Sequence, residues 1–145
     1  MNSNILAYTA GLIDGEGTVT LMRVKKNEHR VPVVSLSSTT HQLVEFMKLH
    51  FGGRVAPKKT YKAHHKKSYH WDLSYQKAVE FLKLIRPYMH EPEKCRRADL
   101  LIAKFPALVK RNGKYTPEEL AKRHDFEREF FANSPSVKLV DVAGQ

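Results

Sequence analysis

Near its N-terminus the chain reads Ala7-Tyr8-Thr9-Ala10-Gly11-Leu12-Ile13-Asp14-Gly15-Glu16-Gly17. The pattern predicts a short helix that ends on an acidic, glycine-rich turn and leads directly into a strand. Gly11 and Gly15 are four residues apart, so they lie on one helix face and expose the backbone there. Asp14 and Glu16 lie where the helix dipole is already negative, which is unfavourable for an acid and favours a bound cation.

Other interpretations of this acidic turn exist. An Asp-Gly-Glu-Gly sequence is also typical of an ordinary turn that ends a helix. A calcium-binding loop fits poorly, because the twelfth position counted from Asp14 is Lys25 and not a glutamate. The preceding Ala-Gly-Leu-Ile and the strand pattern that follows favour a functional site over a plain turn.

The nine residues from Thr9 to Gly17 resemble the LAGLIDADG motif of homing endonucleases. Three positions differ from that motif, one of them Gly15, which stands where the motif has its second alanine. Thr9 replaces the leading leucine, and Glu16 replaces the last aspartate, which lengthens the side chain by one methylene and keeps its charge. No second copy of the motif is present, since the only glycines after residue 53 are Gly113 and Gly144.

Composition predicts one globular domain and a polyanionic partner. The chain has 145 residues, of which 41% are hydrophobic, and a formal charge of +10. We expect a domain over residues 1–132 and a tail of uncertain order over 133–145. The single cysteine, Cys95, excludes an internal disulfide, and we find neither an apolar run of membrane length nor a signal peptide. An intracellular, reducing compartment is therefore expected, without membrane contact or secretion.

Periodicity predicts an α+β fold. Strands are expected over residues 18–26, 30–37, 54–58 and 68–73, and helices over the motif, between Thr40 and Gly52, and over 76–85, 93–109 and 117–132. Pro32 should fall near a sheet edge or at a position whose N–H would be unpaired, and Pro106 should kink or break its helix. The predicted sheet has four mostly antiparallel strands with helices on one face. The LAGLIDADG fold has the same α-β-β-α-β-β-α order, and the resemblance implies a saddle-like sheet that binds the DNA major groove.

The positive charge is concentrated between Gly17 and Trp71, where 11 Lys and Arg face only two acids, Glu28 and Glu45. A basic region of this kind is typical of phosphate binding, and outward side chains of a sheet can contact base edges. The expected DNA-binding residues are Thr20, Met22, Lys25, Lys26, Arg30, Ser35, Arg54, Lys58, Lys62, Lys66, Lys67, His70 and Asp72.

The family resemblance implies specific roles at the motif. Glu16 and the carbonyl of Gly15 would hold Mg²⁺, for which Mn²⁺ or Ca²⁺ can substitute in binding. Lys94 matches a basic residue near the scissile phosphate, and Ser38 and Gln42 match polar positions that orient water. Single-motif relatives are homodimers, which places Ala7, Ala10, Gly11, Asp14 and Gly15 at the expected dimer interface. Asp14 has an alternative role, in which it caps or orients the turn.

These features predict a site-specific homing endonuclease that cleaves a long, near-palindromic double-stranded DNA site as a homodimer. The alternative, also found among proteins of this fold, is a binder that does not cleave. Such a protein would be either an RNA maturase that assists intron splicing or a DNA-binding regulator. The acid at Glu16 favours cleavage.

Overall fold

The computed structural model describes residues 1–25, 29–59, 66–110 and 113–132. Five α-helices and one short 3-10 helix accompany four strands within these ranges. In chain order the elements are α1 (Ser3–Glu16), β1 (Gly17–Met22), β2 (Val31–Ser38), α2 (His41–Phe51), β3 (Arg54–Pro57), β4 (Tyr69–Ser74), α3 (Tyr75–Ile85), η1 (Arg86–Tyr88), α4 (Pro92–Leu108) and α5 (Pro117–Phe131).

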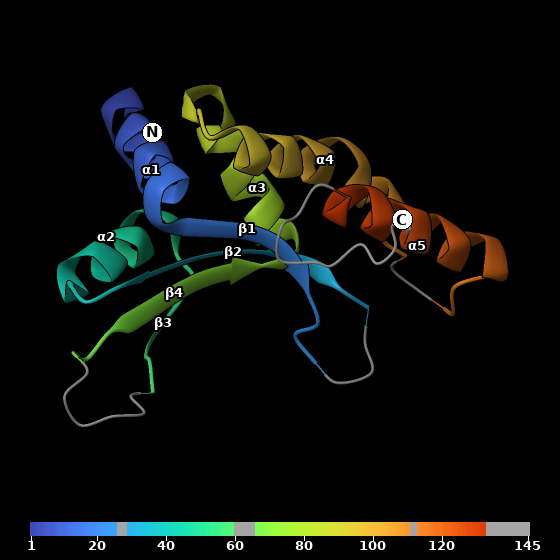
Figure 1. The fold of residues 1–145 in the computed structure, drawn as a ribbon, viewed down its shortest axis with the longest axis horizontal. Helices are drawn as coiled ribbons and strands as arrows, with labels where there is room; N and C mark the ends of the chain where they lie inside the picture. Colours follow the sequence, from blue (N-terminus) through green and yellow to red (C-terminus); the bar gives the residue numbers. More distant parts are fainter. Residues whose placement is uncertain (26–28, 60–65, 111–112, 133–145) are drawn as a thin grey trace.

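The four strands form one antiparallel sheet in the order β1-β2-β4-β3. Figure 1 shows the helices on one side of this curved sheet, while the other side is left open. The predicted α+β class, with helices on one face of an antiparallel sheet, is confirmed. The open side is the surface that strand alternation had assigned to polar side chains.

The core lies between the sheet and the helices. Val19 and Leu21 of β1 and Trp71 and Leu73 of β4 are buried, as their alternation predicts. Trp71 is completely buried, and its indole N–H donates to the carbonyl of Gly52 at 2.8 Å. This packing fixes the register of the sheet, because a slip by one residue would move Trp71 to the open side.

Several element boundaries differ from the predictions. β1 ends at Met22 and does not continue to residue 26. Pro32 lies in the interior strand β2, but β4 pairs with β2 only from Val33 onward, so Pro32 has a neighbour on one side alone. Pro106 lies inside α4, only two residues before its end, and does not break it. Residues 26–28, between the two predicted strands, and the tail 133–145 lie outside the described residues.

Candidate functional site

The motif is a helix-to-strand junction with a close backbone approach. α1 ends at Glu16, and β1 begins at Gly17. A Cβ atom added to Gly17 would lie 2.8 Å from the Cα of Ile13 and 2.8 Å from its side chain. Only glycine fits at that position, so the sharp transition holds Glu16 at the end of α1 with its side chain exposed.

Asp14 stabilises this junction through hydrogen bonds within the chain. Its two carboxylate oxygens accept hydrogen bonds from the backbone N–H groups of His90 (2.8 Å) and Glu91 (3.2 Å), immediately before α4. This arrangement corresponds to the alternative in which Asp14 orients the turn. Asp14 therefore binds backbone groups of its own chain. This role was not part of its predicted place at the dimer interface.

Lys94 of α4 binds the same end of α1, through hydrogen bonds to backbone carbonyls. Its ammonium group donates to the carbonyls of Ile13 (3.0 Å) and Asp14 (2.8 Å), which are among the last carbonyls of α1. A cation at the negative end of a helix dipole is favourable. An ammonium group has three donors, so one remains beside the end of α1 for a further partner.

Glu16 borders a shallow hollow, which we call the motif hollow. It has a volume of about 460 Å³ and is lined by Leu12, Glu16, Leu36, Ser37, Ser38, Thr39, Leu43, Lys58 and Ser68. The hydroxyl of Ser38 accepts the N–H of Thr40 at 3.0 Å. Gln42 lies exposed in the first turn of α2, outside this lining. Two predicted catalytic residues, Glu16 and Ser38, are therefore brought together with a lysine.

The donor set at the motif suits a hard cation. A carboxylate at Glu16 and the adjacent backbone carbonyl of Gly15 are oxygen ligands, which Mg²⁺ and Ca²⁺ prefer. A Cβ atom added to Gly15 would meet nothing within 4 Å, so the approach to this position is open. The described residues contain no group of three or more His, Cys, Asp or Glu that could hold a metal. Remaining ligands would then be water and substrate oxygens.

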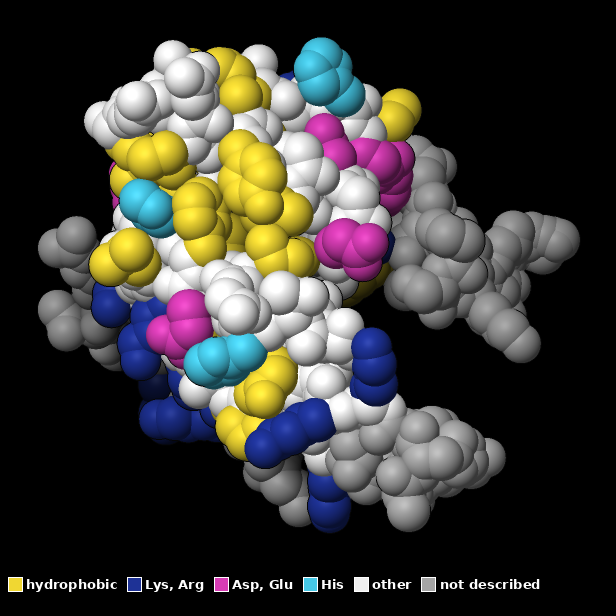
Figure 2. All heavy atoms as spheres, turned by 90° about the vertical axis from the view of Figure 1, so that its left-hand side faces the viewer, with side chains coloured by type: hydrophobic (Ala, Val, Ile, Leu, Met, Phe, Trp, Pro, Cys, Tyr) yellow, Lys and Arg dark blue, Asp and Glu magenta, His cyan; other side chains and the backbone are white. Residues whose placement is uncertain are grey.

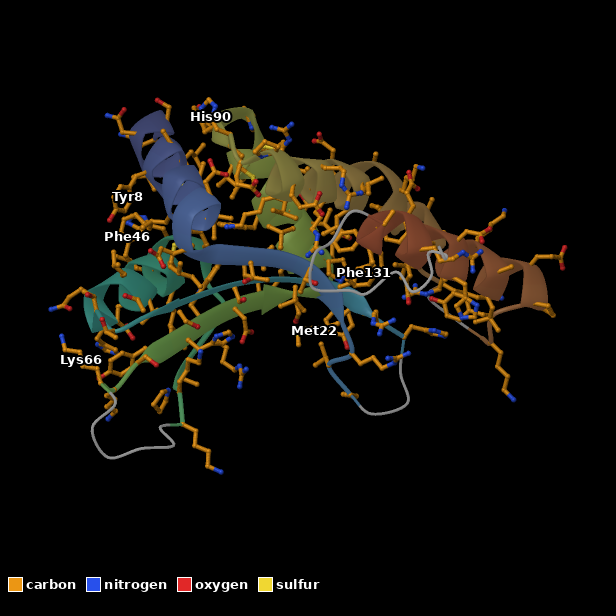
Figure 3. The ribbon with its side chains drawn as sticks, viewed as in Figure 1. Tyr8, Met22, Phe46, Lys66, His90 and Phe131 are labelled. Carbon is orange, nitrogen blue, oxygen red and sulfur yellow. The ribbon has the colours of Figure 1, made fainter. Side chains whose placement is uncertain are left out.

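A second hollow, the sheet hollow, lies on the open side of the sheet. It has a volume of about 810 Å³ and is lined by Thr18, Thr20, Met22, Arg23, Val24, Val33, Ser35, Gly53, Arg54, His70, Asp72, Leu73, Ser74 and Lys77. Six of the predicted DNA-binding residues thus share one surface. Figure 3 shows Met22 at the end of β1, directed away from the helices.

Polar side chains within the sheet hollow are linked to one another. Asp72 pairs with Arg54 at 2.9 Å and with His70 at 3.2 Å, and the other ring nitrogen of His70 lies 3.0 Å from the hydroxyl of Ser37. The Arg54 side chain is 70% exposed, whereas that of Asp72 is 18% exposed. Asp72 therefore anchors a guanidinium group that projects into solvent, where it is available to a base or phosphate.

The other predicted DNA-binding residues are distributed around this face. Lys25, Lys66 and Lys67 are exposed, and Lys58 lines the motif hollow. Lys26 and Lys62 lie outside the described residues. Arg30, also predicted to bind DNA, has a partner within the chain: its guanidinium binds Glu127 of α5 at 2.9 Å and lies over the ring of Phe131. Arg30 directly precedes β2 and Glu127 lies on α5, so this ion pair joins the two elements.

Sequence reasoning missed two basic residues that line the sheet hollow, Arg23 and Lys77. Arg23 follows the outward-facing Met22 at the end of β1, so a shorter predicted strand would have drawn attention to it. Lys77 lies in the first turn of α3, and strand alternation carries no information about it.

The exposed face of α1 contains Ala7, Gly11 and Gly15. A Cβ atom added to either glycine would meet nothing within 4 Å. Ala10 was predicted on this face, but it is completely buried. It belongs with Leu6 and Ile13 to the i, i+4, i+7 stripe that packs on the core, so it has no surface to offer a partner.

Hydrophobic side chains continue this face onto α2. Tyr8 of α1 and Phe46 of α2 meet edge to face with ring centroids 5.3 Å apart, and Figure 3 shows them side by side. Tyr8 is 51% exposed and Leu49 is 80% exposed. Figure 2 shows hydrophobic side chains gathered on the helical part of this side of the molecule, while Lys and Arg lie mainly toward its lower part.

Comparisons with solved structures identify the fold. No protein-family model matches the sequence, and no curated protein matches it significantly. The homing endonuclease I-CvuI, in complex with its target, is similar with a TM-score of 0.72 and 15% identity over 94% of this chain and 88% of that chain. The archaeal intron-encoded homing endonuclease I-Vdi141I, complexed with DNA, gives 0.59 and 17% over 93% and 87%. The LAGLIDADG homing endonuclease I-LtrWI, bound to target DNA, gives 0.61 and 19% over 92% and 50%.

The chain therefore has the fold of the LAGLIDADG homing endonucleases. It carries one copy of the motif that gives these proteins their name. No helix in the described part of the chain has the length and apolar character needed to cross a membrane.

Proposed function

We propose that this protein is a site-specific endonuclease that binds double-stranded DNA on the open face of its sheet and hydrolyses a phosphodiester bond on each strand. The observation that carries the proposal is the exposed Glu16, held at the end of α1 by Gly17 and bordering a hollow with Ser38 and Lys58. The structural neighbours I-CvuI and I-LtrWI are complexes with target DNA.

Divalent metal would be held by Glu16 and the carbonyl of Gly15, and when bound it supplies charge neutralisation at the phosphate and activation of water. The third donor of Lys94 adds positive charge at the same helix end. Ser38, the last residue of β2, and Gln42, in the first turn of α2, are the proposed residues for orienting water. The neighbour I-CvuI has been crystallised in the presence of Ca and of Mg, which is consistent with use of a divalent metal.

The proposed active form is a homodimer in which α1 packs against α1 of a second copy. One motif provides one acid, and cleavage of two strands requires two. The close contact with Ile13 requires glycine at position 17, but a Cβ atom added at Gly11 or Gly15 would meet nothing within 4 Å, so nothing in the described chain requires glycine there, although glycine lowers helix stability. A close approach by a second helix explains both glycines. The match covers 88% of the I-CvuI chain but only 50% of the I-LtrWI chain. In length, this chain therefore corresponds to one whole I-CvuI chain and to half of I-LtrWI.

The cleavage proposal is tested with a library of randomised duplex sites, incubated with Mg²⁺ or with EDTA. Wild type should make metal-dependent double-strand cuts centred on a near-palindrome. Glu16→Gln keeps the shape and removes the charge, so cleavage should fall at least a hundredfold while DNA affinity stays within about threefold. Glu45→Gln, an exposed acid on α2, is the matched control and should cut normally.

Two outcomes would contradict this proposal. Cutting by Glu16→Gln would remove Glu16 as the metal ligand. Tight binding to a selected site without cutting by wild type would favour the non-cleaving alternative, a DNA-binding regulator or a maturase, and intron RNA would then be the ligand to test.

The dimer is tested by a matched pair of bulky substitutions on exposed helix faces. Gly11→Leu meets open space in the protomer, so its free energy of unfolding should be unchanged or higher, whereas dimer dissociation should increase at least tenfold. Ala103→Leu, on the exposed side of α4, should change neither. Sedimentation equilibrium measures both variants, and an unaltered dimer for Gly11→Leu would exclude packing through α1.

A further inference from the structure

A third cavity, the Arg123 cleft, lies apart from the surfaces assigned to DNA and to a second protomer. It has a volume of about 820 Å³ and lies among the start of β2, the N-terminal end of α3, the C-terminal end of α4 and α5 with its preceding segment. The lining residues are His29, Val31, Tyr75, Gln76, Phe105, Pro106, Val109, Lys110, Tyr115 and Arg123. It shares no lining residue with the sheet hollow.

Arg123 is a buried cation with only neutral hydrogen-bond partners among the described residues. It is 4% exposed, and its guanidinium donates to the hydroxyl of Tyr115 at 3.3 Å and to the carbonyl of Arg30 at 2.7 Å. Its Nε has no hydrogen-bond partner within the described part of the chain. The carboxylate of Glu127, one turn further along α5, forms its ion pair with Arg30. A buried charge without a counter-charge is unfavourable, so an anion in this cleft would be stabilised.

The N-terminal end of α3 adds a second positive contribution. Tyr75 and Gln76, the first residues of this helix, line the cleft. The side chain of the N-cap residue Ser74 makes no capping hydrogen bond in the described structure, so the first N–H groups of α3 lack the side-chain cap that helices commonly have. Tyr75 is also the only described residue other than glycine with a positive φ, at 58°. Such strained backbone is concentrated at ligand sites.

Aromatic rings form much of the wall. Arg123 lies over the rings of Phe105 and Tyr115, at 5.5 and 5.4 Å from their centroids, and His29 meets Tyr115 edge to face at 5.0 Å. Tyr75 and Val109 are 42% and 46% exposed at the mouth. Aromatic walls around a few polar groups are suited to a planar ring, and bases stack on such side chains.

We propose that the Arg123 cleft binds a nucleotide, with its base among the aromatic rings and its phosphate toward Arg123 and the N-terminal end of α3. The nucleotide is either free in solution or part of the DNA that flanks the site bound on the sheet. This binding is separate from cleavage and does not depend on Glu16.

The first test is calorimetric titration of the full chain with dAMP, deoxyadenosine and inorganic phosphate. The base and the phosphate should each contribute, so dAMP should bind saturably and at least tenfold more tightly than either of the other two. Absence of saturable dAMP binding at millimolar concentration, or equal binding of phosphate alone, would overturn the proposal.

Because Arg123 also holds β2 to α5, its removal could unfold the protein, and the site is better tested at the mouth of the cleft. Val109→Glu adds a negative charge there and should weaken dAMP binding at least fivefold, whereas Val109→Gln, of similar size, should change it less than twofold. Arg54→Ala changes the sheet hollow and not the cleft, so it should leave dAMP binding unchanged, whatever its effect on binding of duplex DNA. Loss of dAMP binding in Arg54→Ala with normal binding in Val109→Glu would place the nucleotide on the sheet and exclude the cleft.

The source of the nucleotide is determined with two duplexes that share a central site and differ in the length of their flanks. If the cleft takes a nucleotide from flanking DNA, Val109→Glu should weaken binding of the long duplex at least fivefold and leave the short duplex unchanged. If the ligand is a free nucleotide, neither duplex should respond while dAMP binding is lost. Both results support the cleft as a nucleotide site, and they remain informative if the protein does not cut DNA.

Discussion

The basic residues of α4 and those around the sheet face have opposite uses. Lys94 donates to the end of α1, Arg96 donates to the carbonyls of Glu129 (3.1 Å) and Phe130 (2.7 Å) at the end of α5, and Arg97 donates to the carbonyl of Val19 in β1 at 2.9 Å. Basic residues from a single turn of α4 thus bind three other elements, α1, α5 and β1. By contrast, exposed lysines near the sheet point into solvent, where they are available to phosphate groups. Cations that look alike in sequence are structural in one region and available for binding in the other.

Among the variants that test this difference between the two regions, Arg97→Ala should have the largest effect, a loss of stability. Its side chain is 11% exposed, pairs with Glu93 at 3.1 Å and lies 4.9 Å from the ring centroid of Phe130. Removing it leaves the carbonyl of Val19 without this donor, so the free energy of unfolding should fall by about 3 kcal/mol. Chemical denaturation measures the change. A loss below about 1 kcal/mol would mean that α4 does not depend on this cation.

The converse variant removes two lysines from the sheet side. Lys25 and Lys66 are exposed and make no ion pair within the described part of the chain. Lys25→Ala with Lys66→Ala should weaken DNA binding about tenfold and reduce the salt dependence of log K by about 0.9 for each lysine that contacts a phosphate. Binding is measured by fluorescence anisotropy at several salt concentrations. Stability should stay within about 0.5 kcal/mol of wild type, and an unchanged salt slope would contradict phosphate contact.

The smallest expected effect concerns pH and Glu93. The hydrogen bond from Arg96 is the main cause that lowers the pKa of Glu93, with a further contribution from Arg97. A carboxyl with a lowered pKa in the folded state stabilises the protein above its unfolded pKa, and this contribution is lost as the pH falls through the folded pKa. Glu93→Gln should therefore cost about 1 kcal/mol or less near pH 7, because the pair is partly exposed.

The measurement for Glu93→Gln is the melting temperature of both proteins between pH 3 and pH 7. The difference from wild type should shrink as the pH falls below the ordinary pKa of a glutamate, because the wild-type carboxyl then takes up a proton on unfolding and its lowered pKa in the folded state stabilises the protein less. A difference that is constant over this range would show that the ionised carboxylate does not contribute, and would leave only the packing of the side chain.

Local patterns predicted much of the fold correctly. The alternation in β1 and β4 identified their buried faces, because one side of the sheet is packed against helices and the other is open. Thr116 and Glu119 form a capping box at the start of α5, where a helix over 117–132 was predicted, and both partners of this box lie within one turn. Such features depend on neighbours a few residues away, and sequence periodicity carries that information.

Features that depend on distant partners could not be predicted. Arg30 carries the same charge as the DNA-binding candidates, but its partner Glu127 lies 97 residues further along the chain. Ala10 and Gly11 are both small, and the choice between the buried and the exposed face of α1 requires knowing where the sheet lies. At the site, the motif located Glu16, whereas the anchoring of Arg54 by Asp72 needed the register of β3 against β4.

The crossed contacts at the end of α1 also limit how this protein can be redesigned. Asp14 and Lys94 carry opposite charges, but each binds backbone groups of the other's helix region and not the other side chain. Exchanging the two residues would place a carboxylate against carbonyls and an ammonium against N–H groups. A charge swap commonly rescues an ordinary ion pair. Here it would disrupt both sets of hydrogen bonds, those of residue 14 and those of residue 94. Directed evolution should treat these as two independent positions that cannot compensate for each other.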